Sequence, residues 1–344
     1  MPIATSFTKP LTVEIVDVDR PEVGAHDVVV TTRFSGISAG TELTAYRGTN
    51  PYLDKRWSSE DRLFIPGEST FDYPLVGWGY EESGIVSEIG SEVTDVAVGD
   101  AVFGSWGHRA EAVRPESYFV PRRLPEGLDL EAGVFAHIGG IALNIVLDAD
   151  IHVGETVAVF GLGVPGQLAA QLARLNGATV IGVDGIAQRR ELAQQLGASV
   201  TIDPHAEDVA VRIKELTGGR GADACLEISG NYSALHEAIR SVAYSSRVCA
   251  GGFMQGEGTG LRLGEEFHHN RVQIIGSQIS GVAPHLQHRW DELRLDTTVM
   301  QLAAAGRLEL APLITHRFPL DRAADAFDLL HAGSPDALQV VLEV

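Results

Sequence analysis

The stretch that decides the fold of this chain runs from Glu155 to Asp184 and reads ETVAVFGLGVPGQLAAQLARLNGATVIGVD. An apolar run ending at Phe160 leads directly into a glycine-rich turn, Gly161–Gly166. A helical pattern with leucines three and four residues apart follows, and a second β-rich run ends on Asp184. Strand, glycine turn, helix, strand and acidic residue in this order predict a parallel α/β sheet that binds a dinucleotide.

The residues of the glycine turn each have a physical reason to be there. Gly161 permits a tight strand-to-helix turn, Gly163 lets a pyrophosphate approach the backbone, and Gly166 lets helix and strand pack closely. The helix that begins at Val164 and Pro165 offers free N–H groups and a positive dipole to the phosphates. The alternative is a glycine turn that only packs a helix against a sheet.

The acidic residue that ends the second strand bears on the choice of cofactor. Asp184 lies 23 residues after Gly161, a spacing that suits a carboxylate accepting hydrogen bonds from the adenosine ribose. A carboxylate there would repel the 2′-phosphate of NADP, so NAD is the predicted cofactor. Arg189 follows closely and either contacts the adenine ribose or is a solvated helix residue.

Length and composition limit the classes of protein to which this chain can belong. A chain of 344 residues is long enough for two domains with their own cores. Its formal net charge of −20 is a poor match for nucleic acid or an anionic membrane, so neither is a predicted partner. The apolar runs are short and the N-terminus lacks a basic then apolar segment, which predicts a cytoplasmic protein. Cys225 and Cys249 lie in apolar runs and are expected to be buried free thiols.

The pattern of elements changes along the chain, which predicts an α/β protein with two kinds of domain. The first 140 or so residues are rich in strands and turns, and the segment Thr49–Gly77 is expected to be a long loop at a functional surface. From Glu155 to about Gly281, strands alternate with helices, which predicts a doubly wound parallel sheet of six strands. The expected strands of that sheet are Val157–Phe160, Thr179–Val183, Val200–Ile202, Ala224–Ile228, Val248–Gly251 and Val272–Ser277.

Several motifs in this order resemble the medium-chain dehydrogenase/reductase superfamily over essentially the whole chain. They are Ser35-Gly36-Ile37-Ser38, Gly40-Thr41-Glu42, Gly79-Tyr80-Glu81-Glu82-Ser83-Gly84, Val98-Gly99-Asp100-Ala101-Val102, the glycine turn and Pro312–Leu320. The resemblance implies a GroES-like catalytic domain over residues 1–145 and an NAD-binding Rossmann domain over 146–283. It also implies a C-terminal segment, 284–344, that returns to the catalytic domain, with the active site in the cleft between the domains.

The resemblance extends to a subgroup and to an oligomeric state. The opening motif and the stretch Phe267–Arg271 are similar to the subgroup that contains the bacteriochlorophyllide hydroxyethyl dehydrogenases. In this fold the apolar sixth strand, Val272–Ser277, lies at the sheet edge, and relatives pair it across a two-fold axis. A homodimer is therefore expected.

The chain departs from its zinc-dependent relatives at the metal ligands. Those relatives place a cysteine where this chain has Ser38 and a histidine where it has Tyr80, and the third ligand falls at about His137. A catalytic zinc needs three ligands drawn from Cys, His and carboxylate. The four closely spaced cysteines of the structural zinc lobe are absent as well. Glu81 and Glu82 are the alternative ligands that could restore a site, and the sequence otherwise predicts no metal site.

Without zinc, protic groups must polarise the substrate oxygen and move its proton. Tyr80 could donate a hydrogen bond to a carbonyl or alkoxide, since a tyrosine with a lowered pKa can act as an acid or base, or it could only fill space. His137 is a candidate proton relay or a hydrogen-bonded core histidine. Ser38 and Thr41 belong to a hydroxyl relay or to ordinary turn chemistry.

Further candidates concern substrate and cofactor. Glu42 either binds a polar substrate or is a solvated side chain. Trp57, Trp106 and His108 would form an amphipathic wall for a ring-shaped substrate, and the alternative for His108 is a surface turn. Ligands of doubly wound sheets bind at the carboxyl ends of the strands. The candidates there for the nicotinamide end of the cofactor are Ser229, Gly252 and Ser277.

The expected function is a zinc-independent, NAD(H)-dependent oxidoreductase that interconverts a secondary alcohol and a ketone. Its substrate would be a polyol, a cyclitol, a sugar derivative or a ring-bearing hydroxyethyl compound. The cofactor supplies the hydride and the protein supplies orientation and a proton path. Two alternatives remain open: an NAD(P)H-dependent quinone or enone reductase, and a nucleotide-binding protein that has lost its chemistry with its metal.

Overall fold

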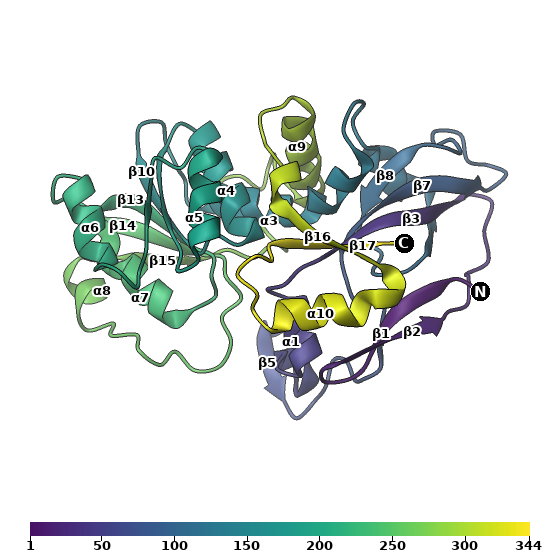
Figure 1. Cartoon of the computed structure of the whole chain (residues 1–344), viewed down its shortest axis with the longest axis horizontal. Helices are drawn as coiled ribbons and strands as arrows, with labels where there is room; N and C mark the ends of the chain where they lie inside the picture. The colour runs from purple at the N-terminus through teal and green to yellow at the C-terminus, as the bar shows by residue number, and fades with distance from the viewer. The chain divides into compact units, whose positions relative to one another are not determined.

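The computed structural model describes all residues, 1–344, and they form two compact units (Figure 1). Unit 1 comprises Met1–His137 and Ile314–Val344, and unit 2 comprises Ile138–Leu313. These bounds differ from the expected ones at 145/146 and 283/284, because two helices belong to the compact body of unit 2. α3 (Phe135–Asp148) and α9 (Glu292–Ala304) pack so closely there that a Cβ on Gly139 would lie 2.5 Å from Val299 Cγ1. The chain therefore returns to unit 1 at residue 314 rather than 284.

Unit 2 contains one parallel sheet of six strands in the order β12-β11-β10-β13-β14-β15. Residues 157–160 of the central strand are at most 1% exposed, which shows that both faces of the sheet are covered. The strands are β10 (Thr156–Phe160), β11 (Thr179–Val183), β12 (Val200–Ile202), β13 (Ala222–Glu227), β14 (Val242–Ala250) and β15 (Gln273–Gly276). The expected doubly wound sheet is confirmed, although β14 begins six residues earlier than expected.

The helices of unit 2 begin at polar capping residues where the sequence offers them. Asp208, Asn231 and Asp291 each accept a backbone N–H of the first turn, at α6, α7 and α9. Besides α3 and α9, the helices of this unit are α4 (Val164–Leu175), α5 (Ala187–Gln195), α6 (Val209–Leu216), α7 (Tyr232–Ser241) and α8 (Glu266–His269). The helix α3 was not expected from the sequence. It belongs to an apolar segment, residues 130–148, that is long enough to cross a membrane but is 72% buried in the protein.

Unit 1 is built on a second six-stranded sheet, in the order β16-β17-β3-β7-β8 with β9 also paired to β3. A three-stranded sheet, β2-β1-β6, and the helices α1 (Glu42–Arg47) and α10 (Ala323–His331) complete it. A core that includes Phe7, Tyr46 and Phe327 joins residues from both ends of the chain. The strands are β1 (Ile3–Lys9), β2 (Thr12–Asp17), β3 (Asp27–Ile37), β6 (Leu75–Val76), β7 (Glu81–Ile89), β8 (Ala101–Gly104), β9 (Glu111–Pro115), β16 (Ile314–Pro319) and β17 (Gln339–Glu343).

The segment expected to be a long loop, residues 49–77, contains regular structure. The strands β4 (Lys55–Ser58) and β5 (Leu63–Pro66) pair as an antiparallel hairpin. The expectation failed because a two-stranded ribbon without a buried face shows no clean alternation of polar and apolar residues. Trp57 and Phe64 lie opposite each other on this hairpin and are 42% and 43% exposed.

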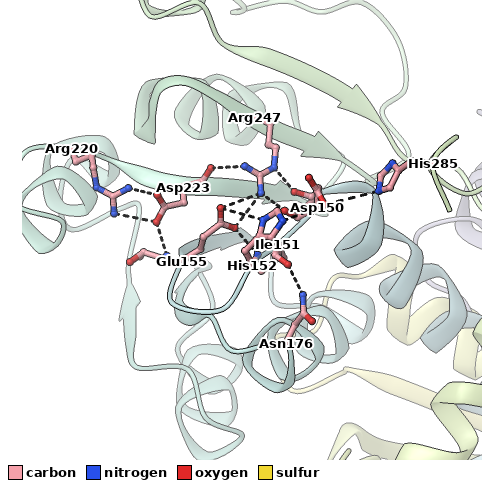
Figure 2. Close-up of polar contacts among 11 residues, drawn as sticks. Asp150, Ile151, His152, Glu155, Asn176, Arg220, Asp223, Arg247 and His285 are labelled. Atoms are coloured by element: carbon pink, nitrogen blue, oxygen red, sulfur yellow. Dashed lines mark hydrogen bonds and ion pairs between the residues drawn. The ribbon is translucent and has the colours of Figure 1, made fainter.

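The amino ends of the strands in unit 2 are held together by partly exposed ion pairs (Figure 2). Arg247 donates to Glu155 at 3.1 Å and to the carbonyl oxygens of Ala149 and Asp150. Asp223 pairs with Arg220 and accepts from the backbone N–H of Thr156 at 2.7 Å. A hollow of about 500 Å³ beside β15 is lined partly by Arg247 and contains none of the glycine-turn residues. Because parallel strands share their polarity, this polar end lies opposite the end where ligands bind, and we assign it a structural role.

Candidate active site

The glycine turn of unit 2 has the geometry that a pyrophosphate requires. Gly161 has φ +90°, and a Cβ on Gly166 would lie 1.9 Å from the carbonyl oxygen of Gly161, so both positions require glycine. Gly163 is the N-cap of α4 and has open space around it, since the nearest group to an added Cβ is Arg189 Nη1 at 4.0 Å. Val164 and Pro165 form the first turn of that helix. No side chain caps this helix end, and the first N–H groups of an α-helix have no partner within the helix, as anion binding needs.

Asp184 braces the same turn. Its Oδ2 accepts from the backbone N–H of Leu162 at 2.7 Å, and its Oδ1 accepts from that of Ile186 at 2.8 Å. A carboxylate oxygen has two lone pairs, so the side chain keeps the capacity to accept hydrogen bonds from ribose hydroxyls. Arg190 instead donates to the carbonyl oxygen of Asp184 and pairs with Asp203.

The carboxyl ends of β13, β14 and β15 carry the other cofactor candidates. Ser229 donates to Glu227 Oε1, Ser277 donates to Asp148 Oδ2 at 2.6 Å, and a Cβ on Gly252 would lie 2.3 Å from the backbone nitrogen of Gly230. The sequence analysis missed Glu227, which is fully buried with its Oε2 unpartnered. Burial raises the pKa of the Glu227 carboxyl, and hydrogen bonds from Ser229 oppose that shift. The signal available in the sequence was an acidic residue directly after the apolar run Ala224–Leu226, near the end of an expected strand.

Unit 1 brings the four candidate catalytic residues together. The Tyr80 hydroxyl donates to Ser38 Oγ, and the ring of Tyr80 meets that of His137 edge-on, with centroids 5.1 Å apart. The backbone N–H of Thr41 donates to the carbonyl oxygen of Ser38 at 3.2 Å, which places its hydroxyl in the same turn. The hydroxyls come from the end of β3 and the segment before β7, while His137 comes from the first turn of α3.

The protonation of Tyr80 differs from the expected one. Burial, with the nearby carboxylates of Glu81 and Glu42, raises the pKa of the Tyr80 hydroxyl far above its usual range, and hydrogen bonds to Ser38 and Thr41 only partly oppose this. Tyr80 therefore remains a phenol at neutral pH. It can donate a hydrogen bond, and it is not a phenolate base.

Behind these hydroxyls lies a fully buried chain of ionisable groups. His108 Nε2 bonds Glu42 Oε2 at 2.6 Å, and its Nδ1 bonds Ser35 Oγ at 2.7 Å. Ser35 in turn donates to Glu82 Oε1 at 3.2 Å. Burial lowers the pKa of His108, but the charges of Glu42 and Glu82 outweigh it and raise the pKa overall. The imidazolium therefore balances the carboxylates beside it.

The buried network also fixes Ser38. The second oxygen of Glu42, Oε1, accepts from the backbone N–H of Ser38 at 2.9 Å, and His108 holds the other oxygen. Glu42 and His108 were expected to contact substrate, yet both side chains are 0% exposed. The structure instead makes them positioning residues for the Ser38 turn.

Glu81 is the remaining acid of this cluster. Its Oε2 accepts from Gln339 Nε2 at 3.2 Å, and its Oε1 is buried without a partner. Burial, followed by the charges of Glu42 and Glu82, raises the pKa of Glu81 well above its usual range. The Glu81 carboxyl therefore holds its proton more tightly than an exposed glutamate does.

The two tryptophans expected in a substrate wall lie in different surroundings. Trp106 is 3% exposed, packs against Phe119 in the core of unit 1 and donates through Nε1 to Thr32 at 3.0 Å. Its expected role as a wall residue is corrected, because an indole with its N–H satisfied inside a core has no face left for a ligand. Trp57 remains exposed on the β4–β5 hairpin.

The donor set at the three family ligand positions does not fit zinc. Ser38 and Tyr80 offer neutral hydroxyls that bond each other, and the raised pKa of Tyr80 keeps it protonated. Glu82 could substitute, but its two oxygens already accept from Ser35, Trp106 and the backbone of Glu81. Of the groups at the three family positions and the two glutamates beside them, His137 and one oxygen of Glu81 remain as donors, fewer than the three that a catalytic zinc requires.

The chain is similar to known proteins in both sequence and structure. The family model described as "Zinc-binding dehydrogenase" matches residues 165–297, which lie entirely within unit 2. The match therefore includes none of the three ligand positions in unit 1. It supports the nucleotide-binding architecture of unit 2, and it carries no information on whether the three positions in unit 1 bind a metal.

Relatives with longer matches cover both units. D-guloside 3-dehydrogenase of Escherichia coli (strain K12) is 33% identical over 314 residues, covering 89% of each chain. L-threonine 3-dehydrogenase of Pyrococcus horikoshii is 28% identical over 373 aligned positions, covering 99% of each. The crystal structure of 2R,3R-butanediol dehydrogenase from Bacillus subtilis superposes with a TM-score of 0.81 at 22% identity, covers all of both chains and shows the same fold.

Proposed function

The chain belongs to the medium-chain dehydrogenase/reductase superfamily, and we propose that it is a zinc-independent, NAD-preferring oxidoreductase. It interconverts a secondary alcohol and a ketone on a polyol, cyclitol, sugar-like or ring-bearing substrate. The observation that carries this proposal is the Tyr80–Ser38–His137 cluster. It places hydrogen-bonding groups where zinc relatives hold the metal that polarises the substrate oxygen.

In the proposed mechanism the protein holds the substrate oxygen and moves its proton. The Tyr80 hydroxyl stays protonated, and its one O–H turns from Ser38 Oγ to donate a hydrogen bond to the carbonyl oxygen or developing alkoxide, as an oxyanion donor does. On oxidation the proton of the alcohol passes through the Ser38 hydroxyl to His137, and on reduction it returns by the same route, while Tyr80 stays protonated throughout. The Glu42–His108 pair keeps the Ser38 turn in place.

We propose that NAD binds at the glycine turn of unit 2. The open space at Gly163 accommodates the pyrophosphate, and Asp184 accepts from the ribose hydroxyls. Ser229, Gly252 and Ser277 border the nicotinamide end, and Arg189 contacts the adenosine end. The bound cofactor supplies or accepts the hydride.

The substrate class rests on one relative and one exposed feature. The 33% identical relative from Escherichia coli is a D-guloside 3-dehydrogenase, whose name describes oxidation of a sugar derivative. On this chain, Trp57 and Phe64 present exposed aromatic faces on the β4–β5 hairpin, with ring centroids 5.1 Å apart. Such faces suit the apolar side of a sugar or other ring.

We also propose that the protein is a cytoplasmic homodimer. β15 is the last strand of its sheet, and Ile274 on it is 39% exposed. An exposed edge strand with an apolar side chain invites pairing with another strand, and a two-fold axis would satisfy both edges.

The test is a substrate panel run on protein treated with a zinc chelator. Polyols, cyclitols, methyl glycosides, quinones and enones are assayed with NAD(H) and NADP(H), and kcat/KM is compared. We expect the highest kcat/KM for a polyhydroxylated secondary alcohol with NAD and no loss of activity after chelation. Turnover of quinones or enones alone would replace the proposal with a reductase. Loss of activity restored only by zinc would overturn zinc independence, and cofactor binding without any turnover would indicate a non-catalytic protein.

A further inference from the structure

A histidine and two glutamates of unit 2 converge outside the residues assigned to the cofactor. His236 lies on α7, Glu265 is the N-cap of α8, and Glu266 is the first residue of α8. One ligand atom from each of these three side chains lies within 4.8 Å of the other two. Imidazole and carboxylate are the nitrogen and oxygen ligands that first-row divalent metals accept.

His236 is the observation that separates this cluster from ordinary surface acids. Its side chain is only 4% exposed, and neither ring nitrogen has a hydrogen-bond partner. A buried imidazole normally satisfies both nitrogens, because an unpaired buried polar group is costly. Here the ring faces two carboxylates instead, at a separation too long for hydrogen bonds and suited to an atom between them.

The carboxylates are oriented by arginines that leave oxygens available. Glu266 Oε1 pairs with Arg240 at 3.6 Å, while its Oε2 is buried without a partner. Glu265 accepts from Arg262 at 2.8 Å through Oε2 alone. Outer partners that hold a ligating carboxylate by one oxygen are a common feature of metal sites.

We propose that His236, Glu265 and Glu266 form a binding site for one divalent transition-metal ion of the Zn²⁺ type, with water completing the coordination. Zinc–ligand distances of about 2.0–2.2 Å in a tetrahedron place neighbouring ligand atoms about 3.4 Å apart, so small side-chain rotations suffice to close the site. The ion would tie α7 to α8 and thereby anchor residues 251–265, the part of the β14–β15 connection that leads into α8. Its role is structural, and it is independent of the zinc-free chemistry proposed for unit 1.

The experiment uses the full-length protein after chelation and desalting. Zn²⁺ is titrated by calorimetry, and Co²⁺ is titrated by its visible absorption, which reports the ligand field directly. The variants are His236→Ala and the shape-conserving Glu266→Gln. The control is His268→Ala, which removes a histidine of the same helix that lies outside the cluster.

We expect one metal ion per chain in the wild type and in His268→Ala, and binding at least tenfold weaker in both cluster variants. Zn²⁺ in excess should raise the melting temperature of the wild type by at least about 3 °C and should raise that of Glu266→Gln by less at the same metal concentration. Stoichiometric binding that survives in Glu266→Gln and His236→Ala, or no binding in the wild type, overturns the proposal. Catalytic activity of the chelated protein is measured in parallel, so that failure here is distinguishable from failure of zinc-independent catalysis.

Discussion

Replacing Tyr80 with phenylalanine removes one hydroxyl and keeps the ring that meets His137 edge-on. Because the pKa of Tyr80 is raised, the hydroxyl is protonated across the working pH range and acts as a donor. Loss of one donor to a developing oxyanion costs about 10²–10³ in kcat, or about 2.7–4 kcal/mol. We therefore expect kcat of Tyr80→Phe to fall by that factor, while binding of NADH in unit 2 is unchanged.

The cost in folding stability should be much smaller than the cost in rate. Tyr80 makes a hydrogen bond to Ser38, and losing one such bond costs about 0.5–1.5 kcal/mol. Tyr73→Phe is a matched control, because Tyr73 donates to the carbonyl oxygen of Ala45 and contacts no catalytic candidate. It should lose similar stability and keep its kcat within about twofold.

The assay is steady-state kinetics with the best substrate of the panel, combined with NADH titration by fluorescence and thermal melts. A kcat for Tyr80→Phe within about threefold of the wild type would falsify the donor role and leave the tyrosine as packing. An equal loss of kcat in Tyr73→Phe would also refute the reasoning, because the effect would then follow stability rather than the hydroxyl.

Three further predictions follow from other parts of the structure. NADH should bind at least tenfold tighter than NADPH, a difference of about 1.4 kcal/mol, and Asp184→Ser should narrow that gap; equal affinities in the wild type would contradict the role of Asp184. The pKa of His108 is raised in the folded state, so its contribution to stability is complete below its unfolded pKa of about 6.5 and is lost as pH rises through the folded value. Chemical denaturation from pH 6 to 9 should therefore show falling stability in the wild type and a flatter profile in His108→Gln, and parallel profiles would count against the buried ion pair. Light scattering at micromolar concentration should give a dimer, and Ile274→Lys on the β15 edge should give a monomer; a monomeric wild type would end the dimer proposal.

The sequence predicted unit 2 well because its signals are local. The bounds of β11 and β12 agree with the expected ones, and the Gly161–Gly166 turn has the conformation that its glycines indicated. Periodicity and turn chemistry act over a few residues, so they can be interpreted without knowing the fold. The helix α3 was not predicted because it is apolar on most sides, and a helix of that kind lacks the usual amphipathic pattern.

The network of unit 1 could not be predicted in the same way. His108 meets Glu42 and Ser35 across 66 and 73 residues, and only the pairing of β3 with β7 and β9 brings these segments together. The grouping of Tyr80, Ser38 and His137 was expected from family resemblance rather than from local pattern. Burial also changes properties that cannot be read from composition, such as the pKa values of the Tyr80 hydroxyl and the Glu81 carboxyl, both of which it raises.

Asp184 sets a constraint on anyone who wishes to redesign the cofactor preference of this enzyme. Its carboxylate holds the backbone N–H groups of Leu162 and Ile186 at the same time, so the proposed recognition of the ribose and the support of the turn share one side chain. A serine at this position is too short to hold both, and the freed N–H of Leu162 would loosen the turn that receives the pyrophosphate. Asparagine keeps one accepting oxygen without the negative charge. An engineering route to the phosphorylated cofactor should therefore start from Asp184→Asn and add a second acceptor for the turn before it adds a new basic residue.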